Sequence, residues 1–184
     1  MEGVFTLPYS EYEVINKMSK LLKKQEGYSF FIPTSRQQKG VDFVILNQKS
    51  KKLLRVQVKS SRSYNDYNKE QNNYLWFNNF LNKYEKGNAD LYVLYGLYPQ
   101  FKEGNKVNAK NKSWRSIILC FSEKEMFKLL DKVKTKKENK PDKFFSFVFD
   151  KPEDVCTNRG FQTKVKLNKY LLDNYQKNIE KRLK

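Results

Sequence analysis

The 184-residue sequence contains no histidine and only two cysteines, Cys120 and Cys156. Without histidine, the chain has no Ser-His-Asp triad, no Cys-His pair and no imidazole general base. Two thiols cannot form a four-cysteine zinc site or a disulfide framework. Any catalysis by this chain must therefore use carboxylates, lysine, tyrosine, serine or a hard metal ion.

Long apolar runs are also missing. No stretch approaches the roughly 20 apolar residues that a membrane-spanning helix needs, and the first ten residues do not resemble a signal peptide. We therefore expect a cytoplasmic protein with no membrane partner. The length predicts a single domain, residues 1–184, and an aromatic content of 15% is typical of a folded chain, because aromatic burial offsets the entropy of ordering.

The charge is strongly one-sided. The 37 Lys and Arg residues against 20 Asp and Glu residues give 37 − 20 = +17. Self-repulsion at such a charge opposes compaction, and the usual counterpart of clustered Lys and Arg is the phosphate backbone of DNA or RNA. A lysine-rich compositional bias without any partner is the alternative. We expect a nucleic-acid partner, with DNA favoured over RNA.

The spacing of apolar residues predicts an alternation of helices and strands. We expect helices at 10–25, 122–133 and 168–183, and strands at 28–32, 41–46, 53–60, 90–97, 114–121 and 144–149. Residues 74–84 fit either a helix or a packed loop. Ser10 with Glu13, and Ser122 with Glu125, match capping boxes. The order predicts an α/β fold in which a mixed central β-sheet is flanked by helices, with its core at 10–150 and a C-terminal helix at about 168–183.

Asp42 interrupts the apolar run at 41–46, which has the pattern of a central strand buried on both faces. A buried carboxylate is costly unless it is paired or bound to a cation. A hairpin after this strand would bring Asp42 beside Gln57 and Lys59, which share one face of the next strand. A carboxylate, an amide carbonyl and an ammonium group would then meet at one end of the sheet.

Such a group of oxygens suits Mg²⁺, with Mn²⁺ as a substitute, because hard cations take oxygen ligands and keep several waters. Asp42 would supply a carboxylate oxygen, Gln57 its side-chain carbonyl and Val58 its backbone carbonyl. Glu11, on the inward stripe of the first helix, would add a second carboxylate. The ion would lower the pKa of a bound water, and Lys59 would hold that water for attack on a phosphate.

Glu11, Gly40-Val41-Asp42 and Gln57-Val58-Lys59, in this order, resemble the motifs of the PD-(D/E)XK, or restriction-endonuclease-like, nuclease superfamily in a Gln-x-Lys variant. The resemblance covers residues 10–62. It implies a restriction-endonuclease-like core and a Mg²⁺-dependent endonuclease that hydrolyses phosphodiester bonds of DNA, in restriction, homing or junction resolution. Asp42, Gln57, Lys59 and Glu11 would be its catalytic residues.

The sequence departs from that pattern at two positions. Val41 stands where the family usually has proline, and Gln57 stands where it usually has an acid, which lowers the charge of the site by one. Cleavage of both strands of a duplex needs two active sites, so the resemblance also favours a homodimer or larger homo-oligomer.

Contacts to nucleic acid are predicted around this site. Side chains that follow the second strand or precede the first would reach phosphate, and they are Ser60, Ser61, Arg62, Tyr64, Arg36 and Lys39. Tyr64, Tyr74 and Trp76 are interleaved with Asn and Lys, a mixture that suits stacking on bases. Trp76 and Phe77 also fit the hydrophobic core, and the lysines at 132–143 fit a solvated face.

Each candidate residue has a structural alternative. Asp42 would then be a strand-start carboxylate bonded to amides, Gln57 and Lys59 the wet face of an edge strand, and Glu11 a first-turn carboxylate favoured by the helix dipole. The corresponding alternatives for the whole protein are a catalytically inactive nucleic-acid-binding module of the same fold and an RNA-binding accessory protein. The relative positions of residues 42, 57 and 59 are the first structural test.

Overall fold

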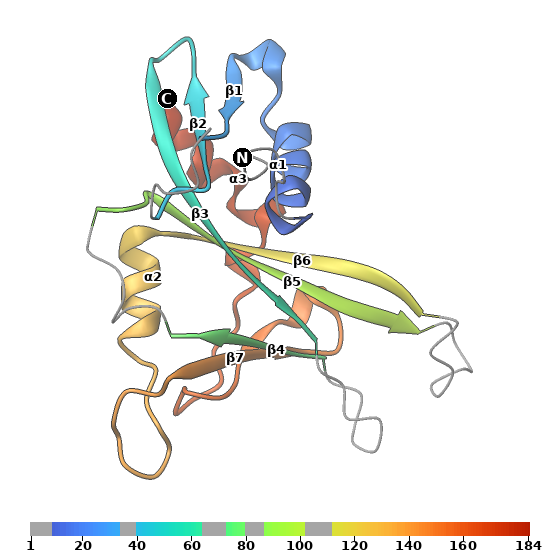
Figure 1. Ribbon diagram of the computed structural model, residues 1–184, viewed down its shortest axis with the longest axis vertical. Coiled ribbons are helices and arrows are strands. Elements are labelled where there is room, and N and C mark those ends of the chain that lie inside the picture. The colour runs from blue at the N-terminus through green and yellow to red at the C-terminus, as the bar shows by residue number, and fades with distance from the viewer. Residues whose placement is uncertain (1–8, 34–39, 64–72, 80–86, 102–111) are drawn as a thin grey trace, which may run out of the picture.

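The computed structural model describes residues 9–33, 40–63, 73–79, 87–101 and 112–184 (Figure 1). Its main elements are three helices and two β-sheets. In chain order they are α1 (Tyr9–Leu21), β1 (Tyr28–Phe31), β2 (Phe43–Asn47), β3 (Lys52–Arg62), β4 (Asn73–Asn78), β5 (Leu91–Phe101), β6 (Lys112–Ser122), α2 (Glu123–Leu130), β7 (Phe144–Phe149), β8 (Cys156–Thr157) and α3 (Leu172–Leu183).

The larger sheet has five strands in the order β1-β2-β3-β5-β6. Strands β1, β2 and β3 form an antiparallel meander, β3 pairs with β5 in parallel, and β5 pairs with β6 antiparallel. The smaller sheet has the order β4-β7-β8 and is antiparallel. The prediction of an α/β fold with a mixed central sheet is therefore confirmed.

Each face of the large sheet is covered by a different layer (Figure 1). Helices α1 and α3 pack on the face that carries Val56 and Val58 of β3. Helix α2 and the small sheet pack on the other face, which carries Tyr92 and Leu94 of β5. Because successive strand residues point to opposite faces, β3 presents Gln57 and Lys59 to this second layer. None of the helices that the structure describes is long and apolar enough to cross a membrane.

The two sheets come into close contact at Gly96 of β5. A Cβ atom at this position would lie 2.3 Å from Cδ1 of Leu75 in β4 and 3.0 Å from Cγ2 of Ile117 in β6. Only glycine leaves room for Leu75, which is 1% exposed and belongs to the core between the sheets. This close approach places β4 against the far end of β3, where Ser63 forms a bridge with Leu75.

The structure corrects several local predictions. Residues 73–78 form strand β4, not a helix or a packed loop. Strand β2 is second from the edge of its sheet and its burial alternates, so it is not a central strand buried on both faces. Helix α1 already includes Ser10, which therefore does not precede the helix as a cap, and it ends at Leu21. The capping box of Ser122 and Glu125 is confirmed.

An ion pair joins β3 to the start of β5. Asp90 accepts hydrogen bonds from the backbone N–H, Nε and Nη2 of Arg55 at 2.9, 3.0 and 3.1 Å. Burial by itself raises the pKa of Asp90, but the hydrogen bonds from Arg55 outweigh it and hold this pKa below its ordinary value. A lowered pKa in the folded state stabilises the fold above the unfolded-state pKa, and this contribution is lost as the pH falls.

We therefore expect D90N to lower the free energy of unfolding by about 1 kcal/mol at pH 7. The difference from wild type should shrink as the pH falls below about 4. Urea unfolding at a series of pH values measures it. The matched control is E138Q, because Glu138 pairs with Lys140 on the exposed surface and should show little difference at any pH. A deficit of D90N that does not change with pH would contradict this account.

Candidate active site

Asp42 lies one residue before β2, at a turn that requires glycine. Gly40 has a φ of +90°, and a Cβ atom there would lie 2.9 Å from the Cβ of Asn88. Glycine tolerates both the left-handed backbone and the close approach. Two residues later the N–H of Asp42 donates to the carbonyl of Val56 at 2.8 Å, which fixes the backbone of Asp42 against β3.

The side chain of Asp42 also binds β3. Its Oδ2 accepts the backbone N–H of Val58 at 2.6 Å. Val58 stands between Gln57 and Lys59 in the sequence, so the carboxylate lies against the segment of β3 that was predicted to share its site. Residue 42 and residues 57–59 are therefore neighbours. The structural alternative for Asp42, a strand-start carboxylate bonded to backbone amides, would make the same hydrogen bond.

Gln57 is buried, which removes the wet-face alternative for this residue. Only 3% of it is exposed, and its Oε1 has no hydrogen-bond partner among the described residues. In the parallel pairing with β5, its cross-strand neighbour is Tyr92, which belongs to the core between the sheets. A buried carbonyl oxygen without a partner costs about 1–3 kcal/mol, so the position of this amide calls for an explanation.

Lys59 follows on the same face of β3, and its cross-strand neighbour is Leu94. It is half-buried. Strand β2 pairs with β3 only as far as Val56, whereas β3 continues to Arg62. Lys59 is thus the first cation along the part of β3 that extends beyond β2. Lys59 directly follows Val58, whose backbone N–H binds the Asp42 carboxylate.

Glu11 belongs to a different layer. It is half-buried on α1, one turn before the buried Val14. Helix α1 packs on the face of the sheet that carries Val56 and Val58, whereas Gln57 and Lys59 face the opposite layer. The structure therefore places the Asp42 carboxylate against the backbone of β3 at Val58, between Gln57 and Lys59 in sequence, but it does not place the helix of Glu11 on the face of Gln57 and Lys59. The participation of Glu11 stays a prediction.

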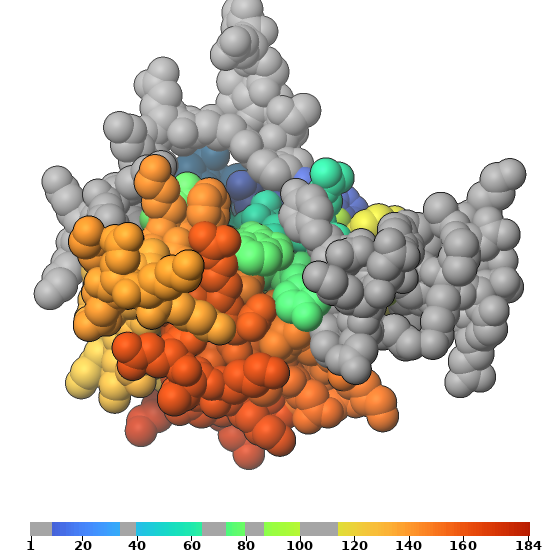
Figure 2. Space-filling view, turned by 90° about the horizontal axis from the view of Figure 1, so that it is seen from below, coloured from blue at the N-terminus to red at the C-terminus, as the bar shows by residue number. Residues whose placement is uncertain are grey.

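Ser60, Ser61 and Arg62 line a groove of about 590 Å³ directly beyond Lys59. Its other walls come from the first residues of α1, from β4, from β5 and from the start of β7. The Oγ of Ser61 accepts the backbone N–H of Trp76 at 3.2 Å and so ties β3 to β4. Figure 2 shows β4, in green, at the surface beside the teal end of β3. We call this hollow the β3–β4 groove.

Tyr95 of β5 also lines the groove. Burial raises the pKa of its hydroxyl to about 12, with Tyr9 and Glu13 adding to the effect, so Tyr95 stays neutral at any physiological pH. Tyr9 and Phe144 could not be predicted as lining residues of this groove, because they come from distant parts of the chain. Of the predicted nucleic-acid contacts, Arg36, Lys39 and Tyr64 lie outside the described residues.

The donor set at residue 42 contains few acids. Within the described part of the chain, no group of three His, Cys, Asp or Glu side chains is arranged to hold a metal ion. A cation bound here would instead depend on one carboxylate together with neutral amide oxygens.

No protein-family model matches this chain, and no curated protein or solved structure is significantly similar to it. The interpretation of the site therefore depends on its own chemistry.

Proposed function

We propose that this protein is a metal-dependent DNA endonuclease, a hydrolase of phosphodiester bonds. The observation that carries the proposal is the arrangement around Val58: the Asp42 carboxylate is bonded to its amide at 2.6 Å, and the preceding Gln57 holds a buried Oε1 without a partner in the described structure. Lys59 follows immediately. This order of groups is the one that the PD-(D/E)XK resemblance implies: Asp42 directly precedes β2, which pairs antiparallel with β3.

The atoms of this site fit Mg²⁺ or Mn²⁺. The Asp42 carboxylate, the Gln57 Oε1 and the Val58 carbonyl are oxygen ligands, which these hard cations prefer. A cation would also satisfy the otherwise unpaired oxygen of Gln57. When bound, the ion would lower the pKa of a water and offset charge on the scissile phosphate.

The protein's own residues have separate tasks in this proposal. The Val58 amide orients the Asp42 carboxylate by its hydrogen bond. Lys59 donates to the attacking water or to a phosphate oxygen and offsets the negative charge that develops there. Beyond it, Arg62 is exposed at the end of β3 and contacts the phosphate backbone, as do the serine hydroxyls of the strand.

The charge of the chain supports a polyanionic substrate. A net charge of +17 attracts phosphates and releases their counterions on binding. Cleavage of both strands of a duplex would require a second copy of the chain, so we include a homodimer in the proposal.

The test is incubation of supercoiled plasmid with the purified protein in Mg²⁺, in Mn²⁺ and in EDTA. We expect nicked and linear products with either ion and intact plasmid in EDTA. A parallel binding reaction with a structured RNA distinguishes the endonuclease from an RNA-binding accessory protein. The RNA-binding protein would bind the RNA and leave the plasmid intact. Intact plasmid in both ions would reject the endonuclease.

The second candidate is a catalytically inactive nucleic-acid-binding module of the same fold. It is favoured by two observations: Gln57 stands at the usual position of an acid, and the described residues contain no group of three acids arranged to hold a metal ion. This module would bind DNA with a steep salt dependence and leave plasmid intact in every buffer. The same plasmid assay, run beside a filter-binding titration in salt, therefore distinguishes the two functions.

A further inference from the structure

The β3–β4 groove combines aromatic side chains with hydroxyl and cationic groups. Tyr9 is 65% exposed and Phe144 is 43% exposed, although both are large apolar side chains. Trp76 also lines the groove and is half-buried. Ser60 and Arg62 of β3 line one wall of the groove. Exposed aromatic rings gathered in one hollow indicate a ligand with flat, apolar faces.

The position of Trp76 follows from the alternation of β4. Leu75 and Phe77 face the core, so Trp76 faces outward, next to Ser146 of β7 in the pairing register. Two residues further along β4, Asn78 pairs with Phe144, so Trp76 and Phe144 both lie on the outer face of the small sheet. This face is rigid, because its backbone bonds belong to two paired strands.

Arg159 is held over the ring of Trp76. Its guanidinium carbon lies 5.3 Å from the ring centroid. Its Nε donates to Asp142 at 3.2 Å, and its backbone N–H donates to the Oγ of Ser146 at 3.1 Å. These contacts fix the cation beside the aromatic surface before any ligand arrives. A cation placed next to a stacking platform suits a nucleotide, whose phosphate lies close to its base.

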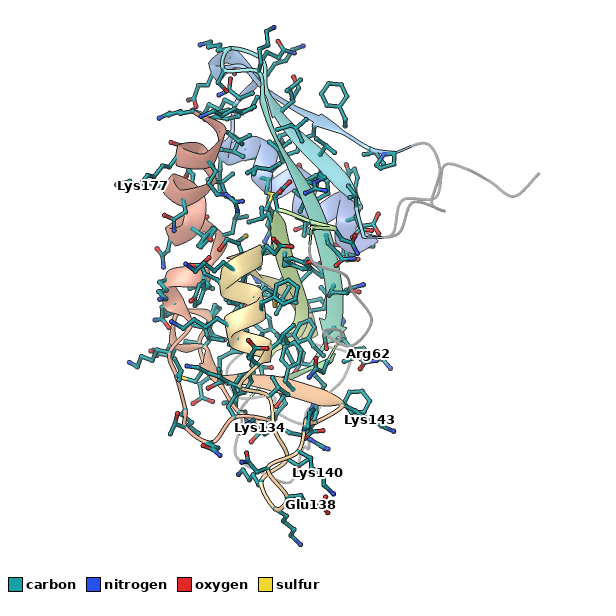
Figure 3. All side chains as sticks on the ribbon, turned by 90° about the vertical axis from the view of Figure 1, so that its left-hand side faces the viewer. Arg62, Lys134, Glu138, Lys140, Lys143 and Lys177 are labelled. Carbon is teal, nitrogen blue, oxygen red and sulfur yellow. The ribbon has the colours of Figure 1, made fainter. Side chains whose placement is uncertain are left out.

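More positive charge flanks the groove at Phe144. Lys143 precedes this residue, and Figure 3 shows Lys143 on the same side of the molecule as Arg62, whereas Lys177 lies on the opposite side. Lys134 and Lys140 lie in the same region of the view, on a loop that is ordered by backbone hydrogen bonds from residue 134 to Gly160 and from Thr135 to residue 140. The loop thus adds two cations to the segment that leads into Lys143 and Phe144.

We propose that the β3–β4 groove binds unpaired nucleotides of single-stranded DNA, with a base stacked on Trp76 and Phe144 and the backbone held by Arg62 and Arg159. A base pair inside a duplex keeps its faces stacked on its neighbours, so exposed rings in a groove gain contact only from unpaired bases. Phosphates alone would need cations but no aromatic rings.

This inference deepens the proposed function and, as a statement about substrate, rests on it. The groove begins one residue beyond Lys59 along β3 but on the opposite face of this strand, because Ser60 and Arg62 pair with Tyr95 and Leu97 of the face that α1 covers. A DNA strand bound there would therefore have to cross from one face of β3 to the other to reach the candidate active site. The substrate would then be DNA with a single-stranded segment, such as a flap, a gap or a junction. Binding itself requires no metal and no cleavage.

The test uses the two tryptophans of the chain, Trp76 and Trp114. Trp114 is 53% exposed and does not line the groove. W114F leaves Trp76 as the only tryptophan, and W76F leaves Trp114. Each variant is titrated in EDTA with a 12-nucleotide oligo(dT), with the matching oligo(rU) and with a 12-base-pair duplex, while tryptophan emission is recorded.

We expect oligo(dT) to quench the emission of W114F strongly and saturably, and to leave W76F almost unquenched. Labelled oligo(dT) should bind W76A about tenfold or more weakly than W114A, whereas the duplex should bind the two variants equally. The W76F variant keeps a ring at this position and should retain most of the affinity, which separates lost stacking from lost folding.

Equal quenching of the two single-tryptophan variants, or equal affinity of W76A and W114A for oligo(dT), would overturn the groove assignment. A tenfold preference for oligo(rU) would overturn the choice of DNA. Failure here is distinct from failure of the nuclease. Plasmid cut in Mg²⁺ by a protein that does not bind oligo(dT) would reject only the groove, and binding in EDTA by a protein that never cuts would reject only the nuclease.

Discussion

D42N is expected to lower the rate of metal-dependent DNA cleavage by about a thousandfold or more, because it removes the one carboxylate among the proposed oxygen ligands of the site. The amide oxygen of asparagine can still accept the N–H of Val58, which the carboxylate binds at 2.6 Å. The free energy of unfolding should therefore change by less than about 1 kcal/mol. Single-turnover cleavage and urea unfolding measure the two quantities.

K59M should lower the cleavage rate by about a hundredfold or more, since it keeps the length of the side chain and removes the donated proton and the charge. The matched control is K52M, at the exposed start of the same strand. This control removes an equal charge from the chain without touching the site, so it should cleave at nearly the wild-type rate. Loss of activity that is equal in K52M and K59M would reduce the role of Lys59 to its contribution to net charge.

The second large effect concerns the buried amide of Gln57. Q57L removes an oxygen that has no partner among the described residues, so the metal-free protein should be as stable as wild type or slightly more stable. Wild type should gain about 3–5 °C in melting temperature at a Mg²⁺ concentration of ten times Kd. Q57L should lose this gain, because its site no longer has the amide oxygen.

Asn47 provides the comparison for a buried amide with partners. It is 5% exposed, and its Oδ1 accepts the backbone N–H groups of Lys49 and Ser50 at 2.9 and 3.4 Å. N47L should therefore lower the free energy of unfolding by about 1–3 kcal/mol and retain its response to Mg²⁺. If Q57L were as destabilised as N47L and still responded to the ion, Gln57 would be an ordinary structural amide.

The reverse substitution restores the acid that the family pattern has at this position. Without metal, Q57E would bury a second carboxylate near Asp42 and should lose about 3 kcal/mol of stability. Mg²⁺ should recover this loss, and the affinity for the ion should rise about tenfold, because an added charged ligand strengthens a hard-cation site. A variant that Mg²⁺ does not stabilise would place the cation elsewhere.

Much of the architecture could be predicted because it is encoded locally. The alternation of Val56 and Val58 with Gln57 and Lys59 correctly gave a strand with two distinct faces, and the spacing of Ser122 and Glu125 gave the start of α2. The hairpin between residues 42 and 57 follows from a short turn, so the proximity of Asp42 to residues 57–59 was also accessible from the sequence.

The remaining features depend on contacts between distant segments. The sequence did not predict strand β4, because its partner β7 lies some 70 residues later and the residues around Trp76 contain no local signal of that pairing. Gln57 is buried because α2 and the small sheet pack on its face of β3. From the sequence alone, its polar side chain is typical of a solvent-exposed face. Glu11 is separated from Gln57 because α1 covers the opposite face of the sheet. The sequence pattern of a helix does not indicate which face of a sheet it will cover.

The central claim is that oxygen atoms at the start of β2 and on β3 hold a divalent cation. Its most direct test is an NMR titration of metal-free, ¹⁵N-labelled protein with substoichiometric Mn²⁺, which broadens the signals of nuclei close to the ion. The account predicts that the amides of residues 42, 57 and 58 and the side-chain amide of Gln57 broaden first, and that D42N abolishes this pattern. Signals at these positions that stay sharp while others in the protein broaden would contradict it.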